Sequence, residues 1–179
     1  WKLRTSSSVC DGVLPKPGPG SMQMRSCATP AASKAAADLL CLSYRNTYRF
    51  PLRITRCANN YGPRQYAEKL IPKAVQYVLA GHAIPLYGDG SQRRCWIAVE
   101  DHCEALLTVL RGGQDGEVYN IPGETELENR VLAQKILLLM GRPEQMIERV
   151  DDRPGHDRCY RISGEKLAQL GYREQVPFE

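Results

Sequence analysis

The stretch that decides the fold class is residues 95–121, CWIAVEDHCEALLTVLRGGQDGEVYNI. It starts with an apolar run of strand length, Cys95 to Val99. Asp101 to Arg111 then shows helical periodicity and is closed by Gly112-Gly113. Glu117 to Ile121 predicts a second short strand. A strand, a helix and a further strand in succession are typical of α/β proteins.

The same alternation continues on both sides of this stretch. Residues 1–28 show neither a helical nor a strand period, so we expect them to be irregular and the folded domain to span 29–179. The further expected elements are a helix from Thr29 to about Tyr48 with a buried apolar stripe at residues 35, 36, 39, 40 and 42, a strand at 52–57, a turn-rich loop at 58–63, a helix over 70–79, a strand at 84–87, a helix over 128–140 and a short helix after Ser163.

Composition limits the classes of function. The chain has 179 residues, of which 42% are apolar, and this is enough to bury a core. The net charge of +4 is spread over 24 basic and 20 acidic residues without a long basic block, so no nucleic-acid partner is expected. No run approaches the ~20 apolar residues that a membrane-spanning helix needs. We therefore expect no membrane partner.

The cysteines indicate the compartment. They number seven, form no Cys-x-x-Cys pair and follow no apolar secretory segment. We therefore expect reduced thiols in a cytoplasmic protein. Cys95, His102 and Cys103 lack the paired short spacing of zinc ligands, so no metal site is expected.

Several motifs follow one another between residues 31 and 158. In order they are AASKAAAD at 31–38, NNYGP at 59–63, EKLIP at 68–72, PLYGDGSQ at 85–92, Arg94 with Trp96, Tyr119-Asn120-Ile121, and DRPGHDR at 152–158. Together they resemble the C-terminal half of dTDP-glucose 4,6-dehydratases, which are extended short-chain dehydrogenase/reductases of the NAD-dependent epimerase/dehydratase family. The resemblance implies the C-terminal part of an NAD(P)-binding Rossmann-like fold together with the smaller substrate-binding domain. It also implies a lyase that converts dTDP-glucose to dTDP-4-keto-6-deoxyglucose with internally recycled NAD.

The resemblance further implies a set of ligand-binding residues. Lys34 and Asn60 are implied to face the NAD cofactor. Lys69, Arg94 and Arg153 are cations that can neutralise phosphate oxygens, and arginine does so bidentately. The residues implied to line the dTDP-sugar site are Asn59, Lys69, Leu70, Pro85, Leu86, Tyr87, Arg94, Asn120, Asp152, Arg153, Pro154, Gly155 and His156.

Three parts of the family's catalytic apparatus are not found in the sequence. The family's catalytic tyrosine stands four residues before its lysine, and Pro30 occupies that position relative to Lys34. No Gly-x-Gly-x-x-Gly turn links a strand to a helix, and no segment matches the Asp-Glu pair that eliminates water. Tyr44 follows Lys34 by more than two helical turns, so it cannot replace the base. We therefore expect a fragment that is inactive by itself.

Alternatives stay open at this point. Pro30 is explained either by a relative that lost the chemistry or by a shifted reading frame across the first residues. Taken singly, residues 152–156 read as a proline-glycine turn, Gly88-Asp89-Gly90 as a hairpin turn and Asn59-Asn60 as a loop held by side-chain hydrogen bonds. The alternative functions are a non-catalytic sugar-nucleotide-binding protein and a UDP-sugar epimerase or decarboxylase. The resemblance also implies a homodimer paired through the helix that carries Lys34.

Overall fold

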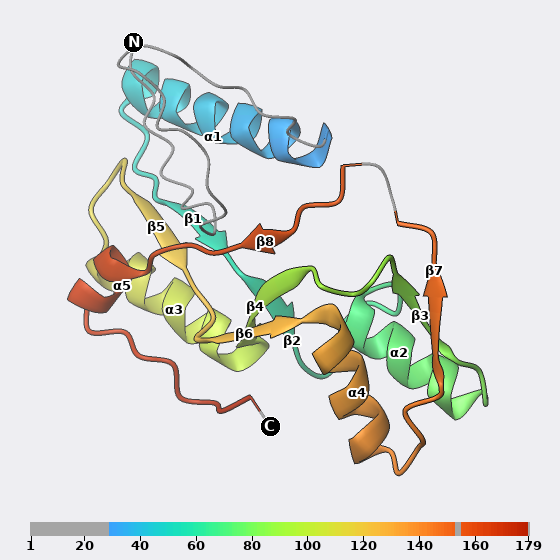
Figure 1. The fold of residues 1–179 in the computed structure, drawn as a ribbon. Coiled ribbons are helices and arrows are strands. Elements are labelled where there is room, and N and C mark those ends of the chain that lie inside the picture. The colour runs from blue at the N-terminus through green and yellow to red at the C-terminus, as the bar shows by residue number, and fades with distance from the viewer. Residues whose placement is uncertain (1–28, 153–154, 179) are drawn as a thin grey trace, which may run out of the picture.

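The fold comes from a computed structural model that describes residues 29–152 and 155–178. Helices and strands alternate along this part of the chain, which confirms the expected α/β class (Figure 1). The helices are α1 (Thr29–Tyr48), α2 (Leu70–Leu79), α3 (Val99–Gly112), α4 (Asn129–Leu139) and α5 (Glu165–Gln169), and the strands are β1 (Ile54–Cys57), β2 (Asn59–Tyr61), β3 (Ile84–Tyr87), β4 (Arg93–Ala98), β5 (Val118–Ile121), β6 (Thr125–Glu128), β7 (Ile147–Val150) and β8 (Cys159–Tyr160).

Strand β4 is the centre of the strand pairing. It pairs with β6 in the antiparallel sense, with β8 in the parallel sense at its start and with β2 in the parallel sense at its end. Two further parallel pairs, β1 with β5 and β3 with β7, stand beside it. Parallel pairs need crossover connections, and the helices supply most of them.

Two consecutive residues of β4 divide the hydrophobic core. Successive side chains of a strand point to opposite faces. Trp96 packs with buried residues of α2, α4 and β3, whereas Ile97 packs with buried residues of α3, β5 and α5. Figure 1 shows these two groups of elements on opposite sides of β4. Residues at the start of β4 therefore lie at the junction of the two halves.

Helix α1 has the predicted bounds but lacks the predicted buried stripe. Ala35, Ala36, Leu39 and Leu40 are exposed, and Leu42 is half-buried. Figure 1 shows α1 standing apart from the other helices. The prediction was wrong because a helical period identifies an apolar face, whereas burial also requires an element packed against that face.

An ion pair ties α1 to β1. Nε and Nη2 of Arg56 donate to Oδ2 of Asp38 at 2.9 Å and 2.7 Å. A second contact runs from Nη2 of Arg45 to the carbonyl oxygen of Asp115 at 3.2 Å. Polar contacts therefore contribute to holding the helix that carries Lys34.

Four strands were not predicted from the sequence. The expected loop at 58–63 contains β2, and β6, β7 and β8 were also missed. The stretch 58–63 is rich in turn formers, but the pairing of residues 59–61 with Trp96–Ala98 of β4 keeps them extended. Strand propensity is weak compared with pairing and packing, so such short strands leave little signal in a sequence.

One of the described cysteines differs from the expectation of reduced thiols. Cys41, Cys57, Cys95 and Cys103 are free thiols, whereas Cys159 is disulfide-bonded. Pairing depends on which sulfur atoms the fold brings together, and spacing along the chain does not reveal this. In the part of the chain that the structure describes, no helix is long and apolar enough to cross a bilayer. Within the same residues, no three His, Cys, Asp or Glu side chains gather closely enough to hold a metal ion.

Candidate functional site

The ends of β3 and β7 bring two of the sequence motifs together. These strands are parallel, with Tyr87 opposite Val150, and the amide of Gly88 donates to the carbonyl of Val150 at 2.9 Å. Asp152 therefore lies beside Gly88. A Cβ atom at Gly88 would lie 3.2 Å from Oδ2 of Asp152, and the backbone there has φ +58. Glycine suits this position because it has neither the clash nor the strain.

Both carboxylate oxygens of Asp152 are engaged. Oδ1 lies 2.6 Å from Nδ1 of His156, and Oδ2 accepts a hydrogen bond from Nε2 of Gln92 at 3.1 Å. The His156 side chain is almost completely buried, and its ring meets that of Tyr87 edge-on at 6.3 Å between centroids. Tyr87, Asp152 and His156, which the resemblance assigns to the sugar-nucleotide site, thus form one cluster.

Arg94 fastens the 152–158 segment to β4. Its Nη2 donates to the carbonyl of Asp157 at 2.8 Å and its Nη1 to the carbonyl of Arg93 at 2.7 Å. Arg94 is only 7% exposed, so a guanidinium cation is buried next to the cluster. Buried arginine needs most of its donors satisfied, and the two carbonyls meet part of that need.

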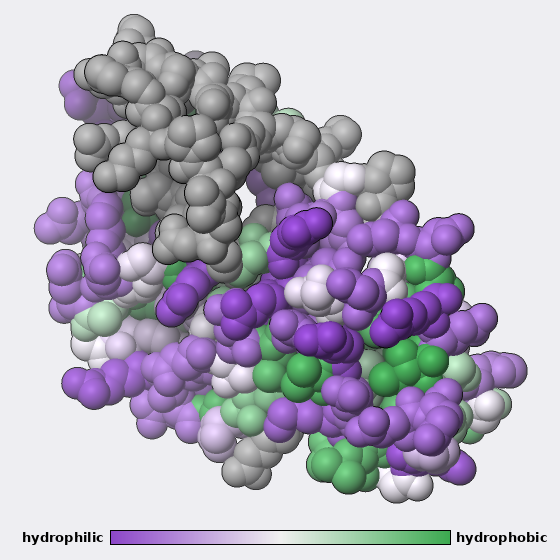
Figure 2. Space-filling model, in the orientation of Figure 1, coloured by the Kyte–Doolittle hydropathy of each residue, from purple (hydrophilic) through white to green (hydrophobic). Residues whose placement is uncertain are grey.

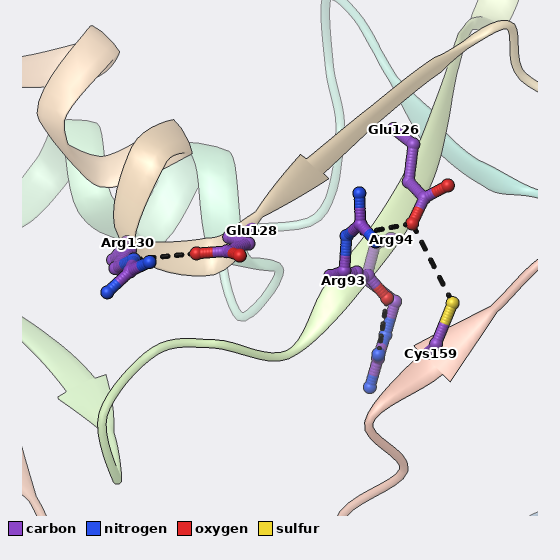
Figure 3. A network of polar contacts seen from close by, with 6 residues as sticks. All are labelled: Arg93, Arg94, Glu126, Glu128, Arg130 and Cys159. Carbon is purple, nitrogen blue, oxygen red and sulfur yellow. Dashed lines mark hydrogen bonds and ion pairs between the residues drawn. The ribbon is translucent and has the colours of Figure 1, made fainter. Parts of the chain in front are cut away.

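The neighbouring side chain Arg93 makes a different set of contacts. Figure 3 shows it directed towards Glu126 of β6, with Nε 2.9 Å from Oε1 of that carboxylate. Sγ of Cys159 lies 3.8 Å from the same oxygen. On the α4 side of this view, Arg130 pairs with Glu128 at 2.6 Å. Arg93 therefore links the strands of this sheet, whereas Arg94 holds the 152–158 segment.

Strand β2 carries the two asparagines of the NNYGP motif. Asn59 is exposed and lies opposite Trp96, and Asn60 is half-buried and lies opposite Ile97. Nδ2 of Asn60 donates to the carbonyl of Ala58 at 3.3 Å. Its Oδ1 is buried and has no hydrogen-bond partner among the described residues. An unpartnered amide oxygen is an acceptor for a ligand donor.

Tyr61 follows these asparagines and contacts the end of the chain. Its ring packs edge-on against Phe178 at 4.8 Å between centroids. Burial raises the pKa of the Tyr61 phenol, and the nearby carboxylates of Glu174 and Asp101 raise it further. The phenol therefore stays protonated at neutral pH.

Lys34 and Asn120 lie nearer to β1. Lys34 is exposed on α1, one turn before Asp38, and Asp38 pairs with Arg56. Arg56 in turn stands opposite Asn120 in the register of β1 and β5. Both predicted residues therefore lie on elements next to β1, Lys34 on α1 and Asn120 on β5.

The remaining predicted residues are spread over α2, β3 and the 152–156 segment. Lys69 is the exposed N-cap of α2 and Leu70 its half-buried first residue. Leu86 is only 4% exposed, so its side chain belongs to the packing beneath Gly90. Pro85 is half-buried on β3, and Gly155 is exposed. Arg153 and Pro154 lie outside the described residues.

Two surface pockets lie on the half of the molecule that contains α2 and α4. One is lined by Tyr66, Ala67, Glu68, Lys73, Gln76 and Tyr77, and the other by Val131, Gln134, Lys135, Leu138, Arg142 and Glu144. Figure 2 shows hydrophobic side chains on the surface of this same region. Neither pocket includes a residue predicted for the ligand site. The cluster around Asp152 is thus recognised from its contacts rather than from a cavity.

Sequence reasoning missed one residue of the cluster. Gln92 is only 5% exposed and bonds to Asp152, which is 60 residues further along the chain. It belongs to the PLYGDGSQ motif, so a signal was present. Its partner, however, is set by how the 152–158 segment returns to β4.

These features define an α/β protein with the parallel pairing of a Rossmann-like fold and a polar cluster at the ends of β3 and β7. The sequence model described as the NAD dependent epimerase/dehydratase family matches residues 6–122, and the chain belongs to this family. The match begins ahead of the first motif at residue 31. Residues 6–28 lie outside the described structure, so the expected domain boundary at residue 29 stays a prediction.

Individual relatives and solved structures agree with this assignment. The chain is 52% identical over 149 residues to the low-salt glycan biosynthesis protein Agl12 of Haloferax volcanii, covering 83% of this chain and 48% of the relative. It is 48% identical over 149 residues to a dTDP-glucose 4,6-dehydratase of Streptomyces niveus, covering 83% of this chain and 44% of the relative. The chain spans about half the length of the curated relatives it matches.

Among solved structures, the dTDP-glucose 4,6-dehydratase of Streptomyces venezuelae, crystallised with NAD and TYD bound, has a TM-score of 0.81 and 48% identity. The match covers 83% of this chain and 46% of that one. The dTDP-glucose 4,6-dehydratase of Bacillus anthracis in complex with NAD has a TM-score of 0.77 and 44% identity, covering 91% of this chain and 52% of that one. The expected Rossmann-like fold is thus confirmed.

Proposed function

We propose that this chain carries the sugar-nucleotide-binding part of an enzyme of the dTDP-glucose 4,6-dehydratase type. The observation that carries the proposal is the meeting of Tyr87, Asp152 and His156 at the ends of β3 and β7, with Arg94 holding the adjoining segment. The 48% identity to solved dehydratases supports the same ligand class. The cluster offers a cation, an imidazole and an aromatic ring, which suit the phosphates and base of a nucleotide.

The residues proposed for the cofactor fit one end of NAD. The unpartnered Oδ1 of Asn60 can accept a hydrogen bond from a ligand, and the exposed ammonium of Lys34 can donate hydrogen bonds. NAD would accept a hydride from the sugar and return it within the same cycle. Pro30 lies in the first turn of α1, where the family places a phenol one turn before the lysine. Proline has no acidic proton, so the chain has no base at that position.

A calorimetric titration tests the ligand class. We expect dTDP to bind the 179-residue chain and UDP to bind more weakly. Tighter binding of UDP would favour a UDP-sugar epimerase or decarboxylase. Absence of heat with both nucleotides, from a chain that shows a cooperative thermal transition, would refute the proposed site.

A turnover assay tests the second candidate function, a non-catalytic sugar-nucleotide-binding protein, which the proline at position 30 favours. With dTDP-glucose and added NAD, we expect no 4-keto sugar to form. Binding without turnover supports the non-catalytic reading for the isolated chain. Formation of the 4-keto product would contradict it and would require a base other than residue 30.

We also propose a homodimer that uses α1, as the resemblance implies. The helix exposes Leu39, Leu40, Tyr44 and Tyr48, and a second copy of the helix would bury these side chains. Sedimentation of the chain and of its Leu40→Glu variant tests this proposal. A dimer that the variant dissociates is expected, and a monomer at all concentrations would refute it. A cytoplasmic location stays a prediction.

A further inference from the structure

Gln92 is a buried polar side chain in the residue just before β4. It is only 5% exposed, although an amide costs free energy to bury unless it is hydrogen-bonded. Its Nε2 donates to Oδ2 of Asp152 at 3.1 Å, while its Oε1 is buried without a partner among the described residues. The backbone of Gln92 is fixed as well, because its carbonyl accepts from the amide of Asn129 at 2.9 Å.

The orientation of this amide follows from the charge of its partner. A carboxylate only accepts hydrogen bonds, so the NH2 group of Gln92 must face Asp152 and the amide oxygen must face away. Gln92 thereby holds one oxygen of a carboxylate that is 41% exposed.

The second oxygen of Asp152 transmits this restraint to His156. Nδ1 of His156 lies 2.6 Å from Oδ1 of Asp152, so the neutral ring carries its proton on Nδ1. Nε2 is then the unprotonated ring nitrogen, which can accept a hydrogen bond. The three residues form a relay in which the amide of Gln92, just before β4, fixes the carboxylate of Asp152, and the carboxylate fixes the ring of His156.

We propose that Gln92 is a positioning residue of the sugar-nucleotide site, acting through Asp152 to set the tautomer and orientation of His156. This inference rests on the proposed function for the identity of the ligand, a nucleoside diphosphate. The relay itself rests on the contacts of Gln92, Asp152 and His156 alone.

Two variants of the full chain test the binding consequence by calorimetry with dTDP. Gln92→Leu keeps the volume and removes the donor, and we expect dTDP affinity to fall about tenfold, which is about 1.4 kcal/mol. Gln92→Glu keeps the shape but sets a second carboxylate against Asp152, so we expect weaker binding than with leucine. Ser91→Ala is the matched control, because the backbone amide of Ser91 bonds to Asp89 instead. Melting curves establish that each variant is folded.

A spectroscopic readout tests the relay without any ligand. The chain has only three histidines, so nitrogen-15 spectra resolve His82, His102 and His156. We expect the wild type to show the Nδ1–H tautomer at His156 and Gln92→Leu to show a mixture, with the other two rings unchanged. Because this spectrum needs no dTDP, it separates the two proposals. If the wild type fails to bind dTDP, the proposed function is refuted. If the His156 signal or the dTDP affinity is unchanged in both Gln92 variants, the proposed role of Gln92 is refuted.

Discussion

Replacing Asp101 by alanine removes the carboxylate that holds the C-terminal segment. Asp101 is only 3% exposed in the first turn of α3. Its Oδ1 accepts from the amide of Gln175 at 3.0 Å and its Oδ2 from the amide of Val176 at 2.8 Å. The segment that follows places Phe178 against Tyr61 and Trp96. The carboxylate thus connects the tail to the strands that carry the asparagine motif.

The loss of stability expected for Asp101→Ala follows from these two hydrogen bonds. A hydrogen bond to a charged group contributes roughly 1.5–3 kcal/mol to stability. Gln175 and Val176 are exposed, so their amides regain water in the variant, and the lower end of that range applies. We expect Asp101→Ala to lower the free energy of unfolding by about 3 kcal/mol. Asp101→Asn keeps one acceptor oxygen and should lose about half as much.

Urea unfolding followed by tryptophan fluorescence measures the effect, since Trp96 lies beside Phe178. Glu100→Ala is the control, because Glu100 is an exposed acidic residue in the same helical turn. The free energy of unfolding of Glu100→Ala should lie within about 0.5 kcal/mol of the wild-type value. Equal losses in Asp101→Ala and Glu100→Ala would show that the charge near the helix N-terminus matters and the tail contact does not.

Three further predictions concern single positions. Gly90→Ala should destabilise the chain by at least about 2 kcal/mol, because the added Cβ would lie 2.4 Å from the Leu86 side chain. Gly81→Ala is the control, since Gly81 has a similar φ but open space around it, and it should lose only about 1 kcal/mol of stability. Equal losses of stability for the two variants in urea unfolding would contradict the packing argument. Burial lowers the pKa of His102 from 6.5, so the folded state binds fewer protons than the unfolded state just below pH 6.5, and stability should fall as the pH drops through that window. The variant His102→Gln should lack this part of the pH dependence, and identical pH slopes in the two proteins would argue against it. Arg94→Lys should lower the free energy of unfolding by about 1–3 kcal/mol, since one ammonium cannot reach both carbonyls that the guanidinium bridges. An unchanged midpoint in urea unfolding would show that stability does not depend on this bridge.

Local signals predicted most of the helices well. The bounds expected for the helix at 29–48 and the strand at 84–87 match α1 and β3, because capping residues, glycine stops and apolar runs act within a few residues. The helix expected over 101–111 begins earlier, at Val99, since its start is set by where β4 ends. The strands at 125–128 and 147–150 were missed because their partners, β4 and β3, lie far along the chain.

The candidate site, like the fold, could be predicted from the sequence only in part. The family resemblance predicted that Tyr87, Asp152 and His156 share one site, and the structure shows that the three residues contact one another, while their role in binding a ligand stays a prediction. It did not show that Leu86 is packed in the interior, or that Gln92 supplies a hydrogen bond to Asp152. Residues in a shared motif need not share a role, because neighbours on a strand face opposite sides.

The sequence by itself determined the α/β class, through the alternation of strand and helix periods, and the family, through ordered motifs from residue 31 onward. It also determined that proline stands where the family needs a phenol, which no fold can reverse. Only the tertiary structure decided which polar groups meet. The Gln92–Asp152 bond spans 60 residues and the bonds from Asp101 to Gln175 and Val176 span 74 and 75. Contacts over such separations depend on chain reversals and strand register, and these are properties of the packed molecule rather than of any local pattern.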